Sequence, residues 1–176
     1  VTSIDPHYHT FGPNASLHHH IYETLIQRDA PGNLKPGLAT SWKLRDDKTW
    51  EFKLRNATYH NGEKFTAEDV AYSLGRVPKV KNSPASFQIY TRAVVAVEIV
   101  DPQTILLKTA TPYPLLPQDI SQIFIIPRGL GAEPATEDFN NGKNAIGTGA
   151  YRFVSYRPGE KIELERNDTY WGEKPH

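Results

Sequence analysis

Histidine is the residue type with the clearest chemical potential in this sequence, because imidazole nitrogens bind transition metals. Five of the seven histidines stand near the start of the chain, at His7, His9, His18, His19 and His20. His7 and His9 can share one face of a strand, but two neutral imidazoles make an incomplete metal site. Three consecutive residues on a helix point about 100° apart and cannot share a face. We therefore expect a solvated helix surface at His18 to His20 and no metal, with nickel binding by these five histidines as the alternative.

The motifs that resemble catalytic signatures have structural explanations. Glu68 and Asp69 are adjacent in the first turn of an expected helix, where acidic side chains stabilise the helix start. Gly147 and Gly149 lack the Lys and Ser/Thr of a phosphate loop and the full glycine pattern of a dinucleotide site, so we expect a turn that enters a strand at Tyr151. The chain has no Cys, which removes thiol nucleophiles and thiolate metal sites. We expect neither an enzyme nor a bound cofactor.

The overall composition is that of a soluble globular protein. The chain has 176 residues, of which 38% are hydrophobic, so it can bury a sizeable core. Lys plus Arg and Asp plus Glu number 20 each, a balance that gives no global attraction to nucleic acid. No run approaches the roughly 18 consecutive apolar residues of a membrane span. The absence of Met leads us to expect a processed chain or an excised fragment.

Alternation of apolar and polar residues predicts three hairpins and one buried strand. Trp50, Phe52 and Leu54 alternate with charged residues, so that one face of the strand is buried and the other is wet. Polar turns separate this strand and two later ones from their partners. The expected hairpins pair 40–44 with 50–54, 94–100 with 104–109, and 151–156 with 161–166, and 123–126 is the buried strand.

Helical spacing of apolar residues predicts two main helices. The first covers 15–28, where Leu17, Ile21 and Leu25 form one apolar face. The second begins at Thr66, a capping residue, and stops at Pro78. A short helix is expected within 115–122, whereas 127–145 is polar and irregular. This mixture of hairpins and short helices without strand–helix–strand alternation favours an α+β fold.

Three stretches of the chain carry a resemblance to a known family. They are Ile4-Asp5-Pro6-His7 with Ile21-Tyr22-Glu23-Thr24-Leu25; the stretch from Pro36-Gly37-Leu38-Ala39-Thr40-Ser41-Trp42 through Trp50-Glu51-Phe52-Lys53-Leu54-Arg55 to His60-Asn61-Gly62-Glu63-Lys64-Phe65-Thr66-Ala67-Glu68-Asp69-Val70; and Gly147-Thr148-Gly149-Ala150-Tyr151-Arg152-Phe153 with Leu164-Glu165-Arg166-Asn167 and Tyr170-Trp171-Gly172. In order and spacing they resemble bacterial extracellular solute-binding protein family 5, the dipeptide-, oligopeptide- and nickel-binding proteins of ABC importers.

The resemblance implies a two-lobed protein that encloses its ligand between the lobes. This chain then corresponds to a periplasmic binding protein type II-like first lobe with a mixed β-sheet and an inserted smaller α+β subdomain. Residues 1–27 and 142–176 are the expected parts of lobe I, 28–141 is the inserted subdomain, and the opposing lobe is absent from this chain. We therefore expect half of a binding site.

Two loops match family loops that lie near the ligand. The first comprises Thr10, Phe11 and Gly12 and is expected to line the cleft with backbone groups. The second comprises Asn82, Ser83, Pro84, Ser86 and Phe87. For the side chains of Phe11 and Phe87, a cleft wall and the protein core both remain open, whereas Tyr90 is expected in the core.

The implied function is that of the substrate-binding component of an ABC importer. It captures a small peptide, with a dipeptide as the first expectation, and delivers it to the permease subunits. The implied location is the periplasm, or a lipid-anchored extracellular position in a Gram-positive bacterium, and the expected state is a monomer that binds no nucleic acid. The alternatives are the binding of nickel or another small solute, or a fragment that presents an interaction surface to a transporter or sensor.

Overall fold

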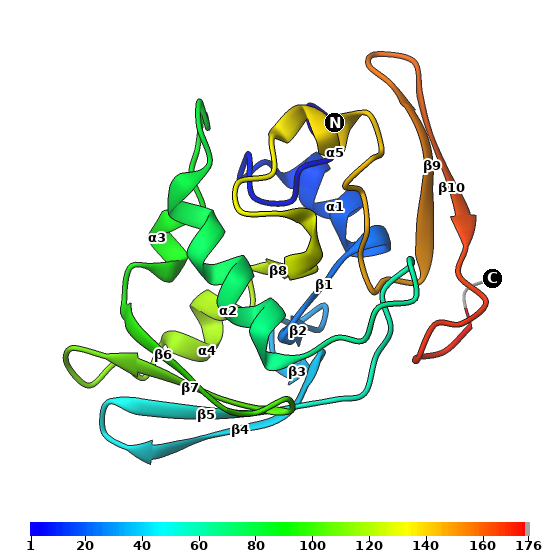
Figure 1. The fold of residues 1–176 in the computed structure, drawn as a ribbon. Coiled ribbons are helices and arrows are strands. Elements are labelled where there is room, and N and C mark those ends of the chain that lie inside the picture. The colour runs from blue at the N-terminus through cyan, green and yellow to red at the C-terminus, as the bar shows by residue number, and fades with distance from the viewer. Residues whose placement is uncertain (175–176) are drawn as a thin grey trace.

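A four-stranded antiparallel sheet forms one end of the molecule in the computed structural model, which describes residues 1–174 (Figure 1). In sheet order its strands are β4 (Ala39–Asp46), β5 (Thr49–Leu54), β7 (Thr104–Thr109) and β6 (Val94–Asp101). Phe52 pairs with Trp42 on one side and with Ile105 on the other. Residues directly opposite each other point to the same face, so these side chains form one apolar row. That face packs against the rest of the protein, and Phe52 and Ile105 are fully buried.

The opposite face of this sheet carries charged side chains that pair across strands. Glu51 on β5 forms an ion pair with Arg45 on β4 at 2.8 Å, and Lys108 on β7 forms one with Glu98 on β6 at 2.7 Å. Alternation along each strand therefore separates an apolar inner face from a charged outer face, as the sequence pattern predicts. The two edge strands also pair irregularly, since both β4 and β6 show two shifts of register.

Short helices cover the apolar face and close the main core. They are α2 (Ala67–Arg76), the 3-10 turn η1 (Val77–Lys79), α3 (Gln88–Thr91) and α4 (Leu116–Ile120). Val70 and Leu74 place the apolar face of α2 in a cluster that also contains Phe52, Ile105 and Phe87. The start of α2 is stabilised by Asp69, whose carboxylate accepts the Thr66 backbone N–H at 2.8 Å. Helix α2 runs from the sheet towards the N-terminal region, so it connects the two ends of the molecule (Figure 1).

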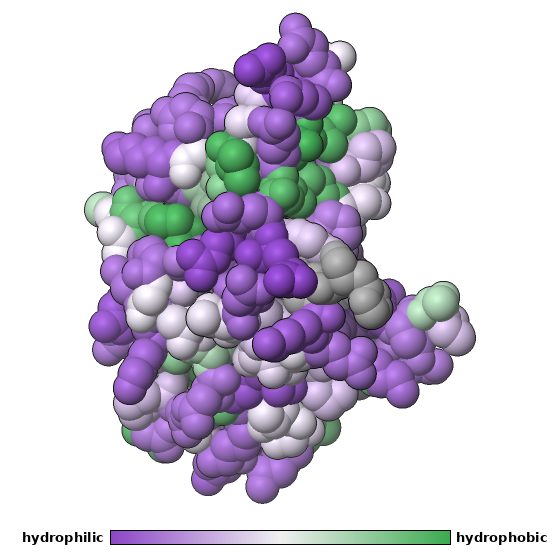
Figure 2. Space-filling model, turned by 90° about the vertical axis from the view of Figure 1, so that its right-hand side faces the viewer, coloured by the Kyte–Doolittle hydropathy of each residue, from purple (hydrophilic) through white to green (hydrophobic). Residues whose placement is uncertain are grey.

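A second group of elements surrounds a smaller apolar cluster that includes Ile4, Ile21, Tyr22, Phe124 and Phe139. These elements are α1 (Gly12–Ile21), α5 (Thr136–Asn140), the 3-10 turn η2 (Arg128–Leu130), the pair β1 (Glu23–Thr24) and β8 (Phe124–Ile125), and the hairpin β9 (Tyr151–Arg157) and β10 (Lys161–Arg166). The pair β2 (Ile26–Arg28) and β3 (Leu34–Pro36) instead contributes Ile26 and Leu34 to the main core. The β9–β10 hairpin stands at the side of the molecule (Figure 1). Figure 2 views that side, where hydrophilic side chains cover the lower part and apolar side chains gather in the upper part.

The segment 147–149 makes close main-chain contacts with two other parts of the chain. The Gly149 N–H donates to the Ile21 carbonyl at 2.9 Å, and the His60 N–H donates to the Gly147 carbonyl at 2.9 Å. Residues 147–149 therefore lie between the end of α1 and the turn at His60. The predicted turn that enters β9 is confirmed, and its two glycines allow this close approach.

The structure confirms the α+β class and all three predicted hairpins. The predicted helix at 15–28 is wrong in its second half, because α1 ends at Ile21 and residues 23–28 form β1 and β2. The segment 127–145, expected to be irregular, contains η2 and α5. Every pairing between named strands of residues 1–174 is antiparallel, and the parallel contact is the isolated bridge between His9 and Ala85.

Candidate functional site

The two loops that the sequence singles out lie side by side. His9 and Ala85 form a parallel bridge, and the Thr10 N–H donates to the Ala85 carbonyl at 3.1 Å. The Ser83 hydroxyl donates to the Tyr8 carbonyl at 2.6 Å. Loop 8–12 and loop 82–87 are therefore held together by hydrogen bonds to main-chain carbonyls, although more than 70 positions separate Tyr8 and Ser83 in sequence.

Backbone groups in the first loop remain available to a ligand. Within residues 1–174, no hydrogen bond occupies the Thr10 carbonyl or the Gly12 N–H. Both residues are exposed, and the space where a Cβ of Gly12 would lie is open to 4 Å. An extended peptide forms main-chain hydrogen bonds with exposed strand-like backbone, so this loop suits such a partner.

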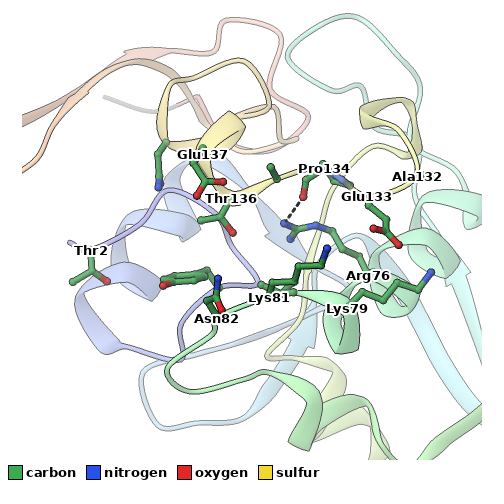
Figure 3. Close-up of a pocket in the computed structure, with 14 residues that line it drawn as sticks. Thr2, Arg76, Lys79, Lys81, Asn82, Ala132, Glu133, Pro134, Thr136 and Glu137 are labelled. Carbon is green, nitrogen blue, oxygen red and sulfur yellow. Dashed lines mark hydrogen bonds between the residues drawn. The ribbon is translucent and has the colours of Figure 1, made fainter.

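A pocket of about 390 Å³ opens beside the paired loops (Figure 3). Tyr8 and Asn82 contribute to its lining from the two loops. The charged side chains around it come from two opposed segments: Lys79 and Lys81 from the chain after α2, and Glu133 and Glu137 from the chain around Pro134. The pocket therefore offers both charge signs, which suits a ligand that carries an amine and a carboxylate.

A buried ion pair lies at the base of this pocket. The two Nη atoms of Arg76 donate to the two carboxylate oxygens of Asp5 at 2.8 and 2.7 Å, and both side chains are at most 5% exposed. The Asp5 carboxylate also accepts the Thr136 hydroxyl at 2.7 Å, and Arg76 donates to the Pro134 carbonyl at 3.1 Å (Figure 3). Burial raises the pKa of Asp5, but Arg76 outweighs this effect and holds the pKa below its ordinary value.

His7 completes this network in a fixed neutral form. Its Nδ1 lies 3.1 Å from an Nη atom of Arg76, which only donates, so Nδ1 accepts and the Nε2–H donates to the Phe124 carbonyl at 2.8 Å. Complete burial, with the nearby Arg76 charge, lowers the pKa of His7 from 6.5 to about 4. Because both ring nitrogens are occupied, His7 has no lone pair for a metal ion.

The structure does not bring the five N-terminal histidines into a metal site. No group of three or more His, Asp or Glu side chains among residues 1–174 is placed to hold a metal ion. His19 and His20 are exposed as expected, but the expectation of a solvated surface is wrong for His18, which is fully buried. Its Nε2 bonds the Ser3 carbonyl at 3.1 Å, and its ring lies edge-on to Tyr22.

The two phenylalanines of the candidate loops have different environments. Phe11 is 38% exposed, so its ring is available as part of a binding surface. Phe87 is 5% exposed and belongs to the main core cluster, where its ring lies 6.2 Å from that of Tyr90. The interpretation of the Phe87 side chain as a cleft wall is therefore wrong, because its apolar surface is already covered by the protein. Thr10, Gly12, Asn82, Pro84 and Ser86 are exposed, and Ser83 is partly exposed.

Sequence reasoning missed most of the pocket lining. Tyr8, Lys79 and Lys81 belong to no distinctive motif, and residues 132–137 were expected to be irregular surface. The signal that was present is Asp5 in the motif Asp5-Pro6-His7, which directly precedes the first loop. Its partner Arg76 is 71 positions away, so no local pattern connects the two.

The buried imidazoles predict that the fold loses stability in mild acid. The pKa of His18 is lowered from 6.5 to about 4 by burial, as is that of His7, so both rings stay neutral in the folded chain. As the pH falls from about 6.5 to about 4, these two imidazoles bind protons in the unfolded chain but not in the folded chain. We therefore expect the free energy of unfolding to fall by an amount on the order of 2–3 kcal/mol per imidazole. Urea unfolding between pH 7 and pH 4.5 measures this loss.

Substitution separates the histidine contribution from that of another buried group, Glu23. The pKa of Glu23 is raised by burial, so its effect opposes that of the histidines as the pH falls. Replacement His18→Gln and replacement His7→Gln should each flatten the pH dependence, because each removes one buried neutral imidazole. Equal slopes for the two variants and the unmodified chain would contradict the assignment.

The chain is similar to known proteins in fold and in sequence. It matches NikZ of Campylobacter jejuni, solved in complex with Ni(L-His), at 27% identity with a TM-score of 0.84, over 99% of this chain and 35% of that one. It matches DppA of Helicobacter pylori, solved in complex with the peptide STSA, at 25% identity with a TM-score of 0.80, over 98% and 38% of the two chains. The fold is thus that of periplasmic binding proteins.

Sequence comparison identifies the family. The family model for bacterial extracellular solute-binding proteins, family 5 Middle, matches residues 33–176. The periplasmic oligopeptide-binding protein OppA of Haemophilus influenzae is 30% identical over 191 aligned positions, which cover 98% of this chain and 35% of OppA. The chain belongs to solute-binding protein family 5, and it spans about a third of the length of these relatives. The predicted resemblance is confirmed.

Proposed function

We propose that this chain forms one wall of the peptide site in the substrate-binding component of an ABC importer. The observation that carries the proposal is the pairing of loop 8–12 with loop 82–87 beside a pocket of about 390 Å³. Free main-chain groups at Thr10 and Gly12 suit the backbone of an extended peptide. The lysines and glutamates at the pocket suit its charged ends.

A dipeptide is our first proposal for the ligand, because a pocket of this volume and both charge signs suit a short zwitterion. The relatives support the peptide class more broadly, since they include OppA as well as DppA with the peptide STSA. NikZ with Ni(L-His) keeps a nickel complex as the second candidate. In that case the metal would arrive with its own ligands, since residues 1–174 hold no cluster for a bare ion.

The remaining parts of the proposal concern the whole protein. Residues 1–27 and 142–176 belong to lobe I, 28–141 to the inserted subdomain, and an opposing lobe completes the enclosure of the ligand. The protein works outside the inner membrane as a monomer, delivers its ligand to the permease subunits, and releases it chemically unchanged. OppA supports the periplasmic location, and no helix within residues 1–174 is long and apolar enough to cross a membrane.

Calorimetric titration with di-, tri- and tetrapeptides tests this function. We expect peptide binding without hydrolysis, tight when the chain is joined to a second lobe and weak for residues 1–176 alone, because half of an enclosing site buries less of the ligand. Replacement Phe11→Ala should weaken binding by about 1.4 kcal/mol, a tenfold rise in Kd. Mass spectrometry of the peptide after incubation checks that no bond is cleaved.

Leu44→Ala is the matched control, since Leu44 is exposed to 48%, similar to Phe11, but lies on edge strand β4. An equal loss from both variants would show that the loops do not bind the peptide. Binding of a nickel–histidine complex in place of every peptide would favour the second candidate. A stable complex with a transporter or sensor protein, without any small ligand, would favour an interaction module.

A further inference from the structure

We propose that Arg76 is a positioning residue for the ligand site: through its ion pair with Asp5 it fixes the relative placement of all three walls of the pocket. This inference rests on the proposed function. The three walls are loop 8–12, segment 79–82 and segment 132–137. Arg76 lies at the end of α2 and Asp5 lies before loop 8–12, whereas Pro134 and Thr136 lie in the third wall. One guanidinium and one carboxylate thus connect three segments that are far apart in sequence.

Two of the three walls, loop 8–12 and segment 79–82, begin close to this ion pair. Loop 8–12 starts three residues after Asp5, and the pocket-lining segment starts at Lys79, three residues after Arg76. The carboxylate of Asp5 also accepts the backbone N–H of His7 at 3.0 Å, and this bond fixes the turn that leads to Tyr8. A shift of the ion pair therefore moves the bases of both walls together.

The four Nη N–H groups of Arg76, which lines the pocket, are already occupied by protein acceptors. The two Nη atoms carry four N–H groups, and these point to the two oxygens of Asp5, to His7 Nδ1 and to the Pro134 carbonyl. The side chain is 5% exposed, and its Cζ lies 4.7 Å from the centre of the Phe139 ring. The Nη groups of Arg76 therefore act on a ligand through the segments that they hold.

Lysine cannot replace this arrangement, which makes Arg76→Lys an informative variant. A lysine keeps the positive charge for Asp5, but its ammonium is a compact donor without the planar fork that reaches several acceptors at once. We expect the carboxylate to retain a partner and the contacts to His7 and Pro134 to be lost. The charge is conserved, whereas the alignment of the three walls is not.

The experiment compares the full-length protein with its Arg76→Lys variant in two measurements. In the ligand-free state, amide NMR signals of Tyr8, Thr10, Gly12, Asn82 and Ser83 should shift together. Peptide affinity, measured by calorimetry well below the melting temperature of each variant, should fall about tenfold, as expected when about one molecule in ten keeps the binding-competent arrangement.

Arg55→Lys is the matched control for a structural effect. Arg55 is a partly buried cation, which donates to the Gly37 carbonyl and lies 3.7 Å over the Trp171 ring, outside the pocket lining. Its variant should lower the melting temperature and leave both the loop signals and the affinity unchanged. Unshifted loop signals in Arg76→Lys, or an equal loss of affinity in Arg55→Lys, would overturn the proposal.

Two further outcomes are also decided by this design. If Arg76→Lys does not fold, Phe139→Leu takes its place, because this fully buried ring supports the guanidinium and cannot touch a ligand. It should produce smaller shifts of the same amides, and unchanged signals would overturn the proposal. If the unmodified protein binds no peptide, the proposed function is wrong, and the loop signals still decide whether Arg76 positions the walls.

Discussion

Replacement of Gly147 by alanine is expected to destabilise the folded chain by about 3 kcal/mol or more. An added Cβ would lie 2.8 Å from the Ile21 carbonyl carbon and 2.9 Å from Tyr22 Cδ1, and closer still to the Ile21 carbonyl oxygen. Ile21 and Tyr22 are fully buried, and the Ile21 carbonyl also accepts the Gly149 N–H at 2.9 Å. These atoms cannot withdraw without breaking the contact between α1 and the segment that leads into β9. Urea denaturation gives the free energy of unfolding.

Gly75→Ala is the control for this prediction. Gly75 lies in α2, and apart from its chain neighbours and the backbone of this helix no atom stands within 4 Å of the position that its Cβ would take. Alanine is favoured over glycine in a helix, so this variant should be more stable by about 0.5–1 kcal/mol. A Gly147→Ala protein as stable as the unmodified chain would show that the close approach at Ile21 does not exist in solution.

Asp5→Asn is expected to cost about 3–5 kcal/mol, because it leaves the charge of Arg76 buried without a counter-charge. Asparagine has nearly the volume of aspartate, so the loss reports charge and hydrogen bonding rather than packing. The Asp5 side chain has no exposed surface, and solvent therefore does not screen the uncompensated charge. Chemical denaturation at pH 7 measures the effect on the free energy of unfolding.

The matched control is Glu98→Gln, which breaks an ion pair at the sheet surface. Lys108 and Glu98 are 42% and 52% exposed, and such pairs contribute about 0–1 kcal/mol. The two variants make the same chemical change to an ion-paired carboxylate, but Asp5 is buried and also accepts hydrogen bonds from Thr136 and the His7 backbone. If both variants lost equally little stability, solvent would screen the Asp5–Arg76 pair, and its positioning role would lose its basis.

The hairpins were predictable from sequence because each strand has its own signal. Trp50, Phe52 and Leu54 alternate with charged residues, and the turn between 46 and 49 is polar, so the pairing of β4 with β5 follows from local pattern alone. The same holds for β9 and β10, which meet through Arg157 and Lys161. The local alternation of apolar and polar residues is sufficient to predict these strands, and the tertiary contacts are consistent with it.

The N-terminal helix shows where local pattern fails. Leu25 continues the helical spacing of Leu17 and Ile21, yet it lies in the main core, beyond the end of α1. The chain leaves the helix at Tyr22, because main-chain groups of Thr24 and Leu25 bond the segment from Gly37 to Ala39. Those partners are distant in sequence, so the period of apolar residues could not reveal them.

The candidate site was predictable in its loops but not in its support. Family resemblance predicts that Thr10 to Gly12 and Asn82 to Phe87 lie near a ligand, and the structure brings these two loops into contact with each other. The buried pair of Asp5 and Arg76 has no sequence signature, since a charged residue on a helix normally faces water. Only the three-dimensional contact shows that this arginine faces inward.

The irregular pairing of the two edge strands has a consequence for how the protein behaves at high concentration. A long, flat edge strand presents unpaired N–H and C=O groups in a regular row, and such a row can recruit a strand from another molecule. Strand β4 breaks this row at Ala39–Ser41 and again at Leu44–Asp46, and β6 breaks it at Val94–Ala96 and Ile99–Asp101. Neither edge strand therefore presents an unbroken row of unpaired N–H and C=O groups along its whole length. This irregularity protects the sheet against strand addition by another molecule and against the fibrous aggregation that can follow.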